Sequence, residues 1–229
     1  MKKGAWNFSA LADARTRKSN NMEIDPQTLP HQSIYKILTG SVLPRPIGWI
    51  SSIDMDGRPN LAPFSFFNAV CSNPPTVVFC PMIRGVDGKT KDTLNNVRAT
   101  NEFVVNIVSE DLAEAMNLSS VEAPPDVNEF EFARVTEEPS VTVRPPRVKE
   151  SRVHFECRVR QIVEIGSEPG GGCLVIGEVL HIHVDDAVLT GGDKILLAAL
   201  KPIGRLAGGG YVRVTDVFEL ERPKTMLKG

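Results

Sequence analysis

The chain has 229 residues, a hydrophobic content of 41%, a charged content of 24% and a formal net charge of −2. These values are typical of a folded globular protein, and they exclude the basic surface with which proteins bind nucleic acid or an anionic membrane. No apolar run approaches the ~20 residues that span a bilayer, and none follows Lys2 and Lys3 to form a signal peptide, so we expect a cytoplasmic protein. The four cysteines form no CxxC pair, so we expect buried free thiols in a reducing compartment.

The N-terminal residues are polar and lack hydrophobic periodicity, which predicts an arm over residues 1–28. Trp6 and Phe8 in this arm are candidates for docking on a partner subunit. We expect one domain over residues 29–220, because no linker-like stretch divides it, and a C-terminal tail over 221–229.

The first predicted element after the arm is a helix over residues 30–40 (PHQSIYKILTG). Gly40 is suited to ending it, since glycine is common at the C-terminal end of helices. The apolar residues Ile34, Ile37 and Leu38 lie on one face of this helix.

A hairpin follows the helix. Pro46–Asp54 and Pro59–Phe67 are able to form strands, and the Asp56-Gly57 pair between them is a strong hairpin signal. Pro63 cannot donate to a central ladder, so the second strand is at an edge, is bulged, or ends near this proline. A broken strand leaves unpaired backbone groups beside flat aromatic side chains. A large planar polar ring needs both from a protein, and a flavin is such a ring.

The rest of the chain contains many strands and few helices. Buried or half-buried strands are predicted at 76–82, 102–109, 152–163, 173–184 and 211–217, and short helices begin at 90 and 110. In the strand at 152–163, polar residues that include His154 and Glu156 alternate with apolar ones, which predicts one solvent-facing side. Five prolines between 121 and 146 predict an irregular excursion. Strands joined by hairpin-length turns predict a mainly β, antiparallel barrel.

A flavin phosphate needs N–H donors, hydroxyl groups and cations. The segment Lys89–Thr93 offers a helix N-terminus, two lysines and two threonine hydroxyl groups, and Ser51 and Ser52 add two more hydroxyls. Taken alone, an exposed helix start with solvated lysines is the more common interpretation of such a segment.

The flavin ring needs a flat apolar wall and hydrogen-bonding groups at its polar edge. The residues from Phe64 to Asn68, with Trp49 on the facing strand, are candidates for both. The alternative is that these aromatic residues are simply core. At least one of Phe66 and Phe67 must point away from any ligand, because successive strand residues face opposite sides.

Six segments of the chain match a known family in the same order: PRPIGWISSIDMDGRPNLAPFSFFN, PPTVVF, GKTKDTLNN, FVVNIV, GEVLHIHV and GRLAGGGY. Together they resemble the flavin reductase-like, FMN-binding split-barrel family, which includes flavoredoxins and related flavin reductases. The resemblance covers residues 30–217. It implies an antiparallel split β-barrel with a few short helices, and a homodimer with each FMN bound near the subunit interface.

The resemblance also implies a set of cofactor contacts. The phosphate would be held around Ser51, Ser52, Lys91, Asp92 and Thr93. The ring would lie along the segment Ala62, Pro63, Phe64, Ser65, Phe66, Phe67 and Asn68, with Trp49 on the facing strand. Arg205 and Tyr211 match a motif that often comes close to the cofactor, although this chain has Ala207 where family members commonly have glycine.

Two histidines on one strand face allow several interpretations. His183 matches a position where flavin reductases often carry a histidine near the nicotinamide, which implies a substrate-side contact. His181 shares its strand face, so the pair resembles two metal ligands, but nothing at suitable spacing supplies a third. We therefore expect no metal site, and a half-exposed strand histidine is the simplest interpretation of His181.

The resemblance implies an FMN-dependent oxidoreductase that takes hydride from NAD(P)H and passes electrons to a flavin or protein acceptor. The flavin would carry out the difficult chemistry, so no catalytic side chain is required. Two alternatives remain: a flavoredoxin-like electron carrier with little nicotinamide activity, and a flavin-binding module without turnover.

Overall fold

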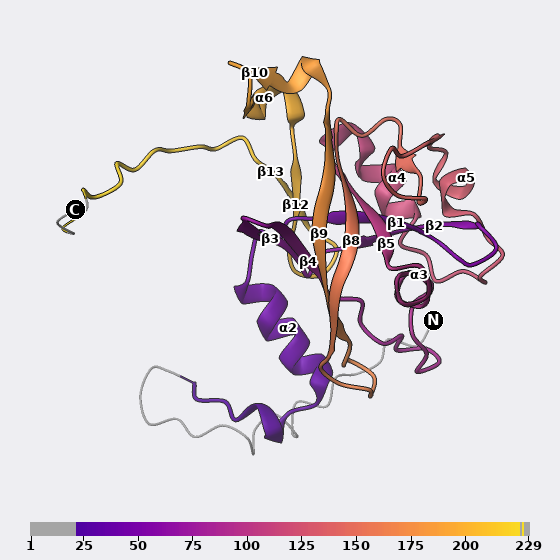
Figure 1. Ribbon diagram of the computed structural model, residues 1–229. Helices are drawn as coiled ribbons and strands as arrows, with labels where there is room; N and C mark the ends of the chain where they lie inside the picture. The colour runs from indigo at the N-terminus through magenta and orange to yellow at the C-terminus, as the bar shows by residue number, and fades with distance from the viewer. Residues whose placement is uncertain (1–21, 225, 227–229) are drawn as a thin grey trace.

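A computed structural model describes residues 22–224 and 226 of the chain, so most of the predicted N-terminal arm, including Trp6 and Phe8, lies outside the described residues. The fold is built on a seven-stranded sheet in which every pair of neighbours is antiparallel (Figure 1). In spatial order the strands are β2 (Pro59–Phe64), β1 (Gly48–Ile53), β5 (Glu102–Ile107), β8 (Val153–Glu164), β9 (Cys173–Val184), β4 (Pro75–Phe79) and β3 (Phe67–Ser72). The predicted mainly β, antiparallel class is confirmed.

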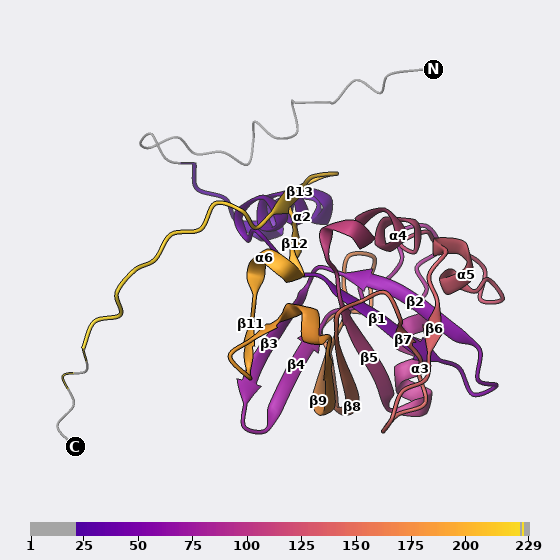
Figure 2. The same ribbon diagram turned by 90° about the horizontal axis from the view of Figure 1, so that it is seen from above.

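The two edge strands of this sheet, β2 and β3, are consecutive in the sequence and are separated only by Ser65 and Phe66. The sheet therefore has to curl until its two edges meet (Figure 2). Phe67 packs directly on β1, because a Cβ added to Gly48 would lie 2.6 Å from the Cδ2 atom of Phe67. The predicted edge position of the second hairpin strand is confirmed. The alternative that it ends near Pro63 is confirmed as well, since the strand stops at Phe64. Phe67 begins a strand that the sequence did not predict.

Short helices and two-stranded ladders complete the fold. The helices are α2 (His31–Ser41), α3 (Asp92–Thr100), α4 (Ala113–Leu118), α5 (Glu129–Ala133) and α6 (Leu197–Leu200), with 3-10 turns η1 (Pro26–Thr28), η2 (Glu110–Leu112) and η3 (Asp186–Val188). The ladders pair β6 (Glu137–Glu138) with β7 (Arg147–Val148), β10 (Leu189–Thr190) with β11 (Lys194–Ile195), and β12 (Ile203–Arg205) with β13 (Tyr211–Arg213). The last predicted strand, at 211–217, is therefore shorter than expected.

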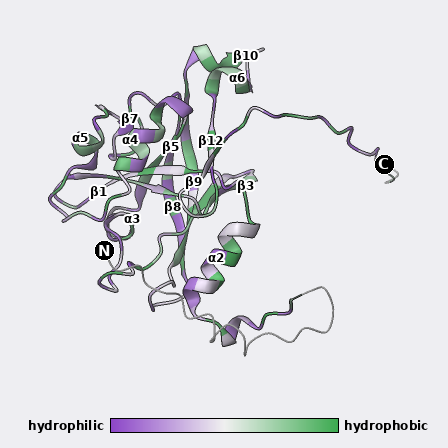
Figure 3. Ribbon diagram, turned by 180° about the vertical axis from the view of Figure 1, so that it is seen from behind, coloured by the Kyte–Doolittle hydropathy of each residue, from purple (hydrophilic) through white to green (hydrophobic). Residues whose placement is uncertain are grey.

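Helix α2 forms where it was predicted, but its apolar side is uncovered. Ile37 and Leu38 are 42% and 52% exposed, and Thr39 is the one buried residue of the helix. Figure 3 shows hydrophobic residues along this helix, which stands apart from the main sheet. The described residues therefore leave much of the apolar face that the sequence pattern predicts exposed.

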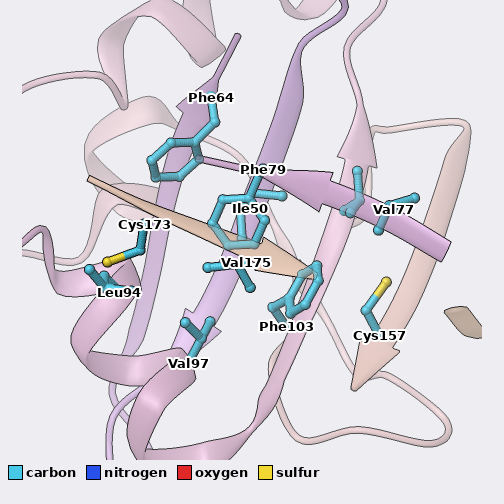
Figure 4. Close-up of a cluster of buried hydrophobic side chains, with 11 residues drawn as sticks. Ile50, Phe64, Val77, Phe79, Leu94, Val97, Phe103, Cys157, Cys173 and Val175 are labelled. Carbon is cyan, nitrogen blue, oxygen red and sulfur yellow. The ribbon is translucent and has the colours of Figure 1, made fainter. Parts of the chain in front are cut away.

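The main core lies inside the curled sheet, where three aromatic rings meet. The centroid of Phe79 is 5.1 Å from those of both Phe64 and Phe103 (Figure 4). Helix α3 closes this cluster with Leu94 and Val97. Because these side chains come from strands distant in sequence, the core ties the edge strand β2 to the start of α3.

The outer side of β8 is covered, contrary to the prediction that His154 and Glu156 face solvent. They are 4% and 0% exposed. The excursion between α4 and β8 folds over this face, and the carboxylate of Glu156 accepts hydrogen bonds from the amides of Val141 and Thr142. Part of the excursion is helical, as α5 shows, so the prediction of a wholly irregular segment is also wrong.

Across the described part of the chain, the helices are too short or too polar to cross a membrane. All four cysteines are free. Cys157 and Cys173 are buried as expected, whereas Cys80 is half-buried and Cys71 is exposed.

Candidate functional site

A cleft opens where the edge strand β2 meets the N-terminus of α3. An inner hollow of about 200 Å³ adjoins an outer hollow of about 890 Å³, and the two share wall residues. The shared residues are Arg84, Asp92, Glu122 and Ala123. The inner hollow is also lined by Asn60, Ala62, Pro63, Phe64, Lys91, Thr93, Ser119, Ser120, Val121 and Glu129. The outer hollow alone is of the size, roughly 300–1,000 Å³, that suits a small organic ligand.

The N-terminus of α3 presents unused donors to this cleft. The amides of Leu94 and Asn95 bond to the carbonyl of Lys91, whereas those of Asp92 and Thr93 have no partner among the described residues. Free amides and the helix dipole together favour an anion at this position. The hydroxyl group of Thr93 accepts a hydrogen bond from the Asn60 amide at 2.9 Å, which fixes its orientation beside β2.

Two cations flank the same helix start. The guanidinium of Arg84 donates to the carbonyl of Thr90 at 3.2 Å and lies 3.3 Å from the carboxylate of Asp92. The ammonium of Lys91 lies 3.8 Å from Glu122 across the cleft. Both cations are thus held at the mouth by carboxylates, and both are partly open to solvent.

The outer edge of β2 supplies backbone acceptors. The amide of Leu61 points away from β1, since it donates to Glu129 Oε2 at 3.1 Å. Alternate strand residues share this direction, so Pro63 also faces outward. Its missing N–H therefore costs no hydrogen bond with β1, and the carbonyl groups of Leu61 and Pro63 face the cleft side.

Glu129 is a buried carboxyl group in the wall of the cleft. It is 8% exposed, and burial raises its pKa, an effect that the Leu61 amide opposes and the charge of Asp92 reinforces. The protonated, neutral form of Glu129 is therefore favoured more strongly than the neutral form of an exposed glutamate.

The predicted ring segment divides at Phe64. Ala62, Pro63 and Phe64 line the cleft, whereas the residues after them leave it. Ser65 accepts a hydrogen bond from Arg45 Nε at 3.3 Å, and Phe66 lies 6.3 Å from the ring of Tyr35 on α2. Beyond these, Phe67 packs on the core and Asn68 is exposed on β3.

The three candidates on β1 are fully buried. The indole of Trp49 donates to Ser119 Oγ at 2.8 Å, so it fixes a residue of the cleft wall. Ser51 donates to the carbonyl of Pro146, and Ser52 accepts from the side chain of Asn96. In this structure the two serine hydroxyls therefore bond inside the protein and do not line the cleft.

Arg205 and Tyr211 lie opposite each other in the β12–β13 ladder. The guanidinium carbon of Arg205 is 4.5 Å from the centroid of the Tyr211 ring, and the phenol of Tyr211 donates to Asn117 at 3.2 Å. Asn117 precedes Ser119 and Ser120 in the cleft wall, so this ladder braces the wall from outside.

His183 is engaged with a buried carboxylate. Its Nε2 atom lies 2.6 Å from Glu156 Oε1, and its ring centroid is 4.6 Å from that of His181 and 5.9 Å from that of His154. Burial works to raise the pKa of Glu156, but hydrogen bonds from Thr142, Val141 and His183 outweigh it and lower that pKa to about 2. His183 is not among the residues that line the cleft.

Sequence reasoning missed several wall residues. Arg84 carried a usable signal, because it is a cation eight residues before the acidic first turn of α3. Asn60 carried another, because it lies two residues before Ala62 and therefore on the same strand face. The remaining wall, from Ser119 to Ala123 together with Glu129, comes from distant loops and gave no local signal.

The comparisons with known proteins agree with this architecture. A family model described as a flavin reductase like domain matches residues 39–198, which is more than half of the chain. The chain therefore belongs to the flavin reductase-like family, and the predicted family resemblance is confirmed.

Three solved structures illustrate the similarity. The nitrilotriacetate monooxygenase component B of Bacillus cereus is 36% identical, with a TM-score of 0.82 over 88% of this chain and 100% of that one. The 2-nitrobenzoate 2-nitroreductase NbaA of Pseudomonas fluorescens is 30% identical, with a TM-score of 0.79 over 90% and 98% of the two chains. A Shewanella frigidimarina protein described as a flavin reductase with a split barrel domain is 22% identical, with a TM-score of 0.75 over 89% and 100%. The last similarity concerns the fold alone, and it confirms the predicted split barrel.

Proposed function

We propose that the chain is an FMN-binding oxidoreductase of the flavin reductase type. It would take hydride from NAD(P)H and pass electrons to a flavin or protein acceptor. One observation carries the proposal: the N-terminus of α3, with Lys91 and Arg84, faces the open edge of β2 across a single cleft.

The residues present in the cleft fit FMN. The free amides of Asp92 and Thr93, together with Arg84 and Lys91, suit the single phosphate of FMN. The carbonyl groups of the β2 edge suit N–H groups of the ring, and Phe64 suits its apolar face. The phosphate would displace Glu122 and Asp92 as partner of the two cations, which are held there by contacts of 3.8 and 3.3 Å.

Bound FMN would supply the hydride and electron-transfer chemistry, and the protein would bind and orient it. Lys91 and Arg84 would neutralise the phosphate, and the β2 edge would fix the ring against the core through Phe64. Trp49 would act indirectly, by holding Ser119 in the wall. His183 is proposed as a substrate-side residue, since its side chain remains 19% exposed beside Glu156.

The names of two relatives suggest two kinds of electron acceptor. The Bacillus cereus relative is named as one component of a monooxygenase, which favours delivery of reduced flavin to a second component. The Pseudomonas fluorescens relative is named as a nitroreductase, which favours direct reduction of a nitroaromatic compound instead. Steady-state assays with free FMN and with 2-nitrobenzoate as acceptors distinguish the two.

We also propose that the protein is a homodimer, because α2 presents an uncovered apolar face. Its four free thiols favour a reducing compartment such as the cytoplasm.

Replacing Lys91 with Ala tests the phosphate site. Loss of one charge-assisted contact, worth roughly 1.5–3 kcal/mol, predicts FMN binding that is about 10–100-fold weaker in a fluorescence titration. The matched control is Lys149→Ala, an exposed lysine outside the cleft, which should bind FMN like the wild type. Unchanged affinity in the Lys91 variant would remove this residue from the site.

Anaerobic addition of NADH or NADPH to the FMN-loaded protein tests the reaction itself. Rapid bleaching of the flavin absorbance is expected of a reductase. Slow bleaching with both nucleotides would instead favour the electron carrier. If protein electron donors also fail to reduce the flavin, the result would favour the flavin-binding module without turnover.

A further inference from the structure

The C-terminal residues 214–224 leave the body of the protein as an extended segment, which we call the C-terminal arm. Figures 1 and 2 both show it running outward from β13, away from the sheet. Within the described residues, no hydrogen bond or ion pair connects the arm to the rest of the chain. Val214, Thr215 and Val217 border a hollow that Leu196, Leu197 and Pro202 also line, so the start of the arm lies against the body. From Phe218 onward, none of the hydrogen bonds or ion pairs of the described residues holds the arm.

The composition of the arm is unusual for a solvated tail. Phe218 and Leu220 are 79% and 84% exposed, and Val214 and Val217 are also open to solvent. In an extended segment alternate residues share a side, so Val214, Phe218 and Leu220 lie on one face, with Asp216 between the first two. An apolar stripe of this kind is typical of a segment that binds another surface.

A receptor surface lies on the same side of the molecule. The β12–β13 ladder, from which the arm departs, is tied to the end of α2 because Arg45 bonds to both Leu206 and Thr39. Helix α2 exposes Tyr35, Ile37 and Leu38, and Tyr35 and Leu38 border an apolar cavity of about 780 Å³. Figure 3 shows hydrophobic residues on both the helix and the arm.

Charge supports pairing between the arm and this helix. Residues 214–221 (VTDVFELE) contain three acidic residues and no basic one, and the two basic residues of the arm, Arg222 and Lys224, come after both Phe218 and Leu220. Helix α2 (HQSIYKILTGS) contains His31 and Lys36 and no acidic residue. Every copy of the chain has both the arm and α2. A two-fold dimer therefore forms two equivalent contacts, each between the arm of one copy and α2 of the other. Each large apolar side chain contributes on the order of 100 Å² or more when buried, so the arm and α2 together approach the ~800 Å² per partner of a standard interface.

We propose that the C-terminal arm of each subunit packs across α2 of a second copy and clamps the dimer. Phe218 and Leu220 are its apolar anchors. Phe218 lies five residues beyond the end of β13, which gives a reach of roughly 17 Å in an extended chain. This inference rests on the proposed homodimer and adds the segment that fastens it.

The first test replaces both anchors, as Phe218→Ser with Leu220→Ser, in the full-length protein. Sedimentation equilibrium should show a dimer for the wild type and a dissociation constant at least 30-fold higher for the double variant. The matched control is Met55→Ser with Val141→Ser, which removes two other exposed apolar side chains (68% and 67%) and should dimerise like the wild type. An unchanged dissociation constant in the arm variant would overturn the proposal.

The second test locates the contact. A photo-crosslinking benzoylphenylalanine at position 218, in a mixture of isotopically heavy and light chains, should join heavy to light chains within residues 31–43. Links confined to one chain, or directed elsewhere, would overturn the proposal even if the protein is a dimer. A monomeric wild type would overturn both the dimer and the arm, whereas FMN titration of the same samples reports separately on the flavin site.

Discussion

Glu156 is a buried and fully hydrogen-bonded side chain, and its replacement with Gln gives a measurable prediction. The carboxylate is fully buried and accepts four hydrogen bonds, from the Val141 amide, the amide and hydroxyl group of Thr142, and His183 Nε2. Gln has the same shape, but it carries no charge and turns an NH2 group toward donors. At least one of the four donors then loses its acceptor in a buried site.

The pKa of Glu156 sets the magnitude. A drop from 4.5 to about 2 is about 2.5 units, and at ~1.36 kcal/mol per unit this is about 3 kcal/mol of folded-state stabilisation at neutral pH. Because the folded pKa is depressed, this stabilisation is fully present above about pH 4.5 and is lost as the pH falls toward 2. The deficit of the Gln variant should shrink over the same interval.

Urea unfolding followed by tryptophan fluorescence is the assay, because Trp49 is buried and reports on the fold. At pH 7 the E156Q variant should unfold about 3 kcal/mol more easily than the wild type, with an unchanged dependence on urea. The matched control is Glu164→Gln, an exposed carboxylate that pairs with Arg98, and its midpoint should stay close to that of the wild type. A loss below about 1 kcal/mol, or a deficit that does not change with pH, would refute the reasoning.

Two further substitutions test the cleft and the core. Burial raises the pKa of Glu129, so its ionisation costs stability as the pH rises from the unfolded value through the folded one. The E129Q variant keeps an acceptor for the Leu61 amide. Its free energy of unfolding in urea should equal that of the wild type in acid and exceed it at pH 8. Equal stability at both pH values would contradict this. Replacing Gly177 with Ala places a Cβ 2.3 Å from Phe103 Cζ, which should cost about 1–3 kcal/mol. Gly209→Ala, in a loop with open space around the added methyl group, is its control, and a G177A variant as stable as this control would show that the ring moves freely.

Local sequence patterns predicted a strand or helix correctly where neighbouring residues in the chain determine it. The strand Cys173–Val184 was predicted with its observed bounds, because it follows a glycine-rich turn and pairs with a neighbour in sequence. Helix α3 was predicted from the helix N-terminus in the segment Lys89–Thr93, and it begins at Asp92. Both signals depend only on residues close together in the chain.

The failures have a common cause, which is contact between distant segments. Alternation placed Glu156 on a solvent face, because nothing in β8 shows that residues 140–148 fold over it. Strand β3 was missed because Phe67 and the exposed residues after it do not alternate, and its pairing with β4 decides its structure. The site shows the same division: Lys91, Asp92 and Thr93 were found from a local helix start, whereas Glu129 and the wall from Ser119 to Ala123 were not.

One interruption in the sequence explains both the fold and the location of the cleft. At Ser65 and Phe66 a single run of residues stops pairing with β1 and starts pairing with β4, so it provides both edges of the sheet. The core closes one side of this break through Phe64 and Phe67. Among the residues that the structure describes, none pairs with the outer edge of strand β2, so its backbone acceptors remain open opposite the amides of α3. In this fold, therefore, the break that lets the sheet close also leaves the edge that a flavin would occupy.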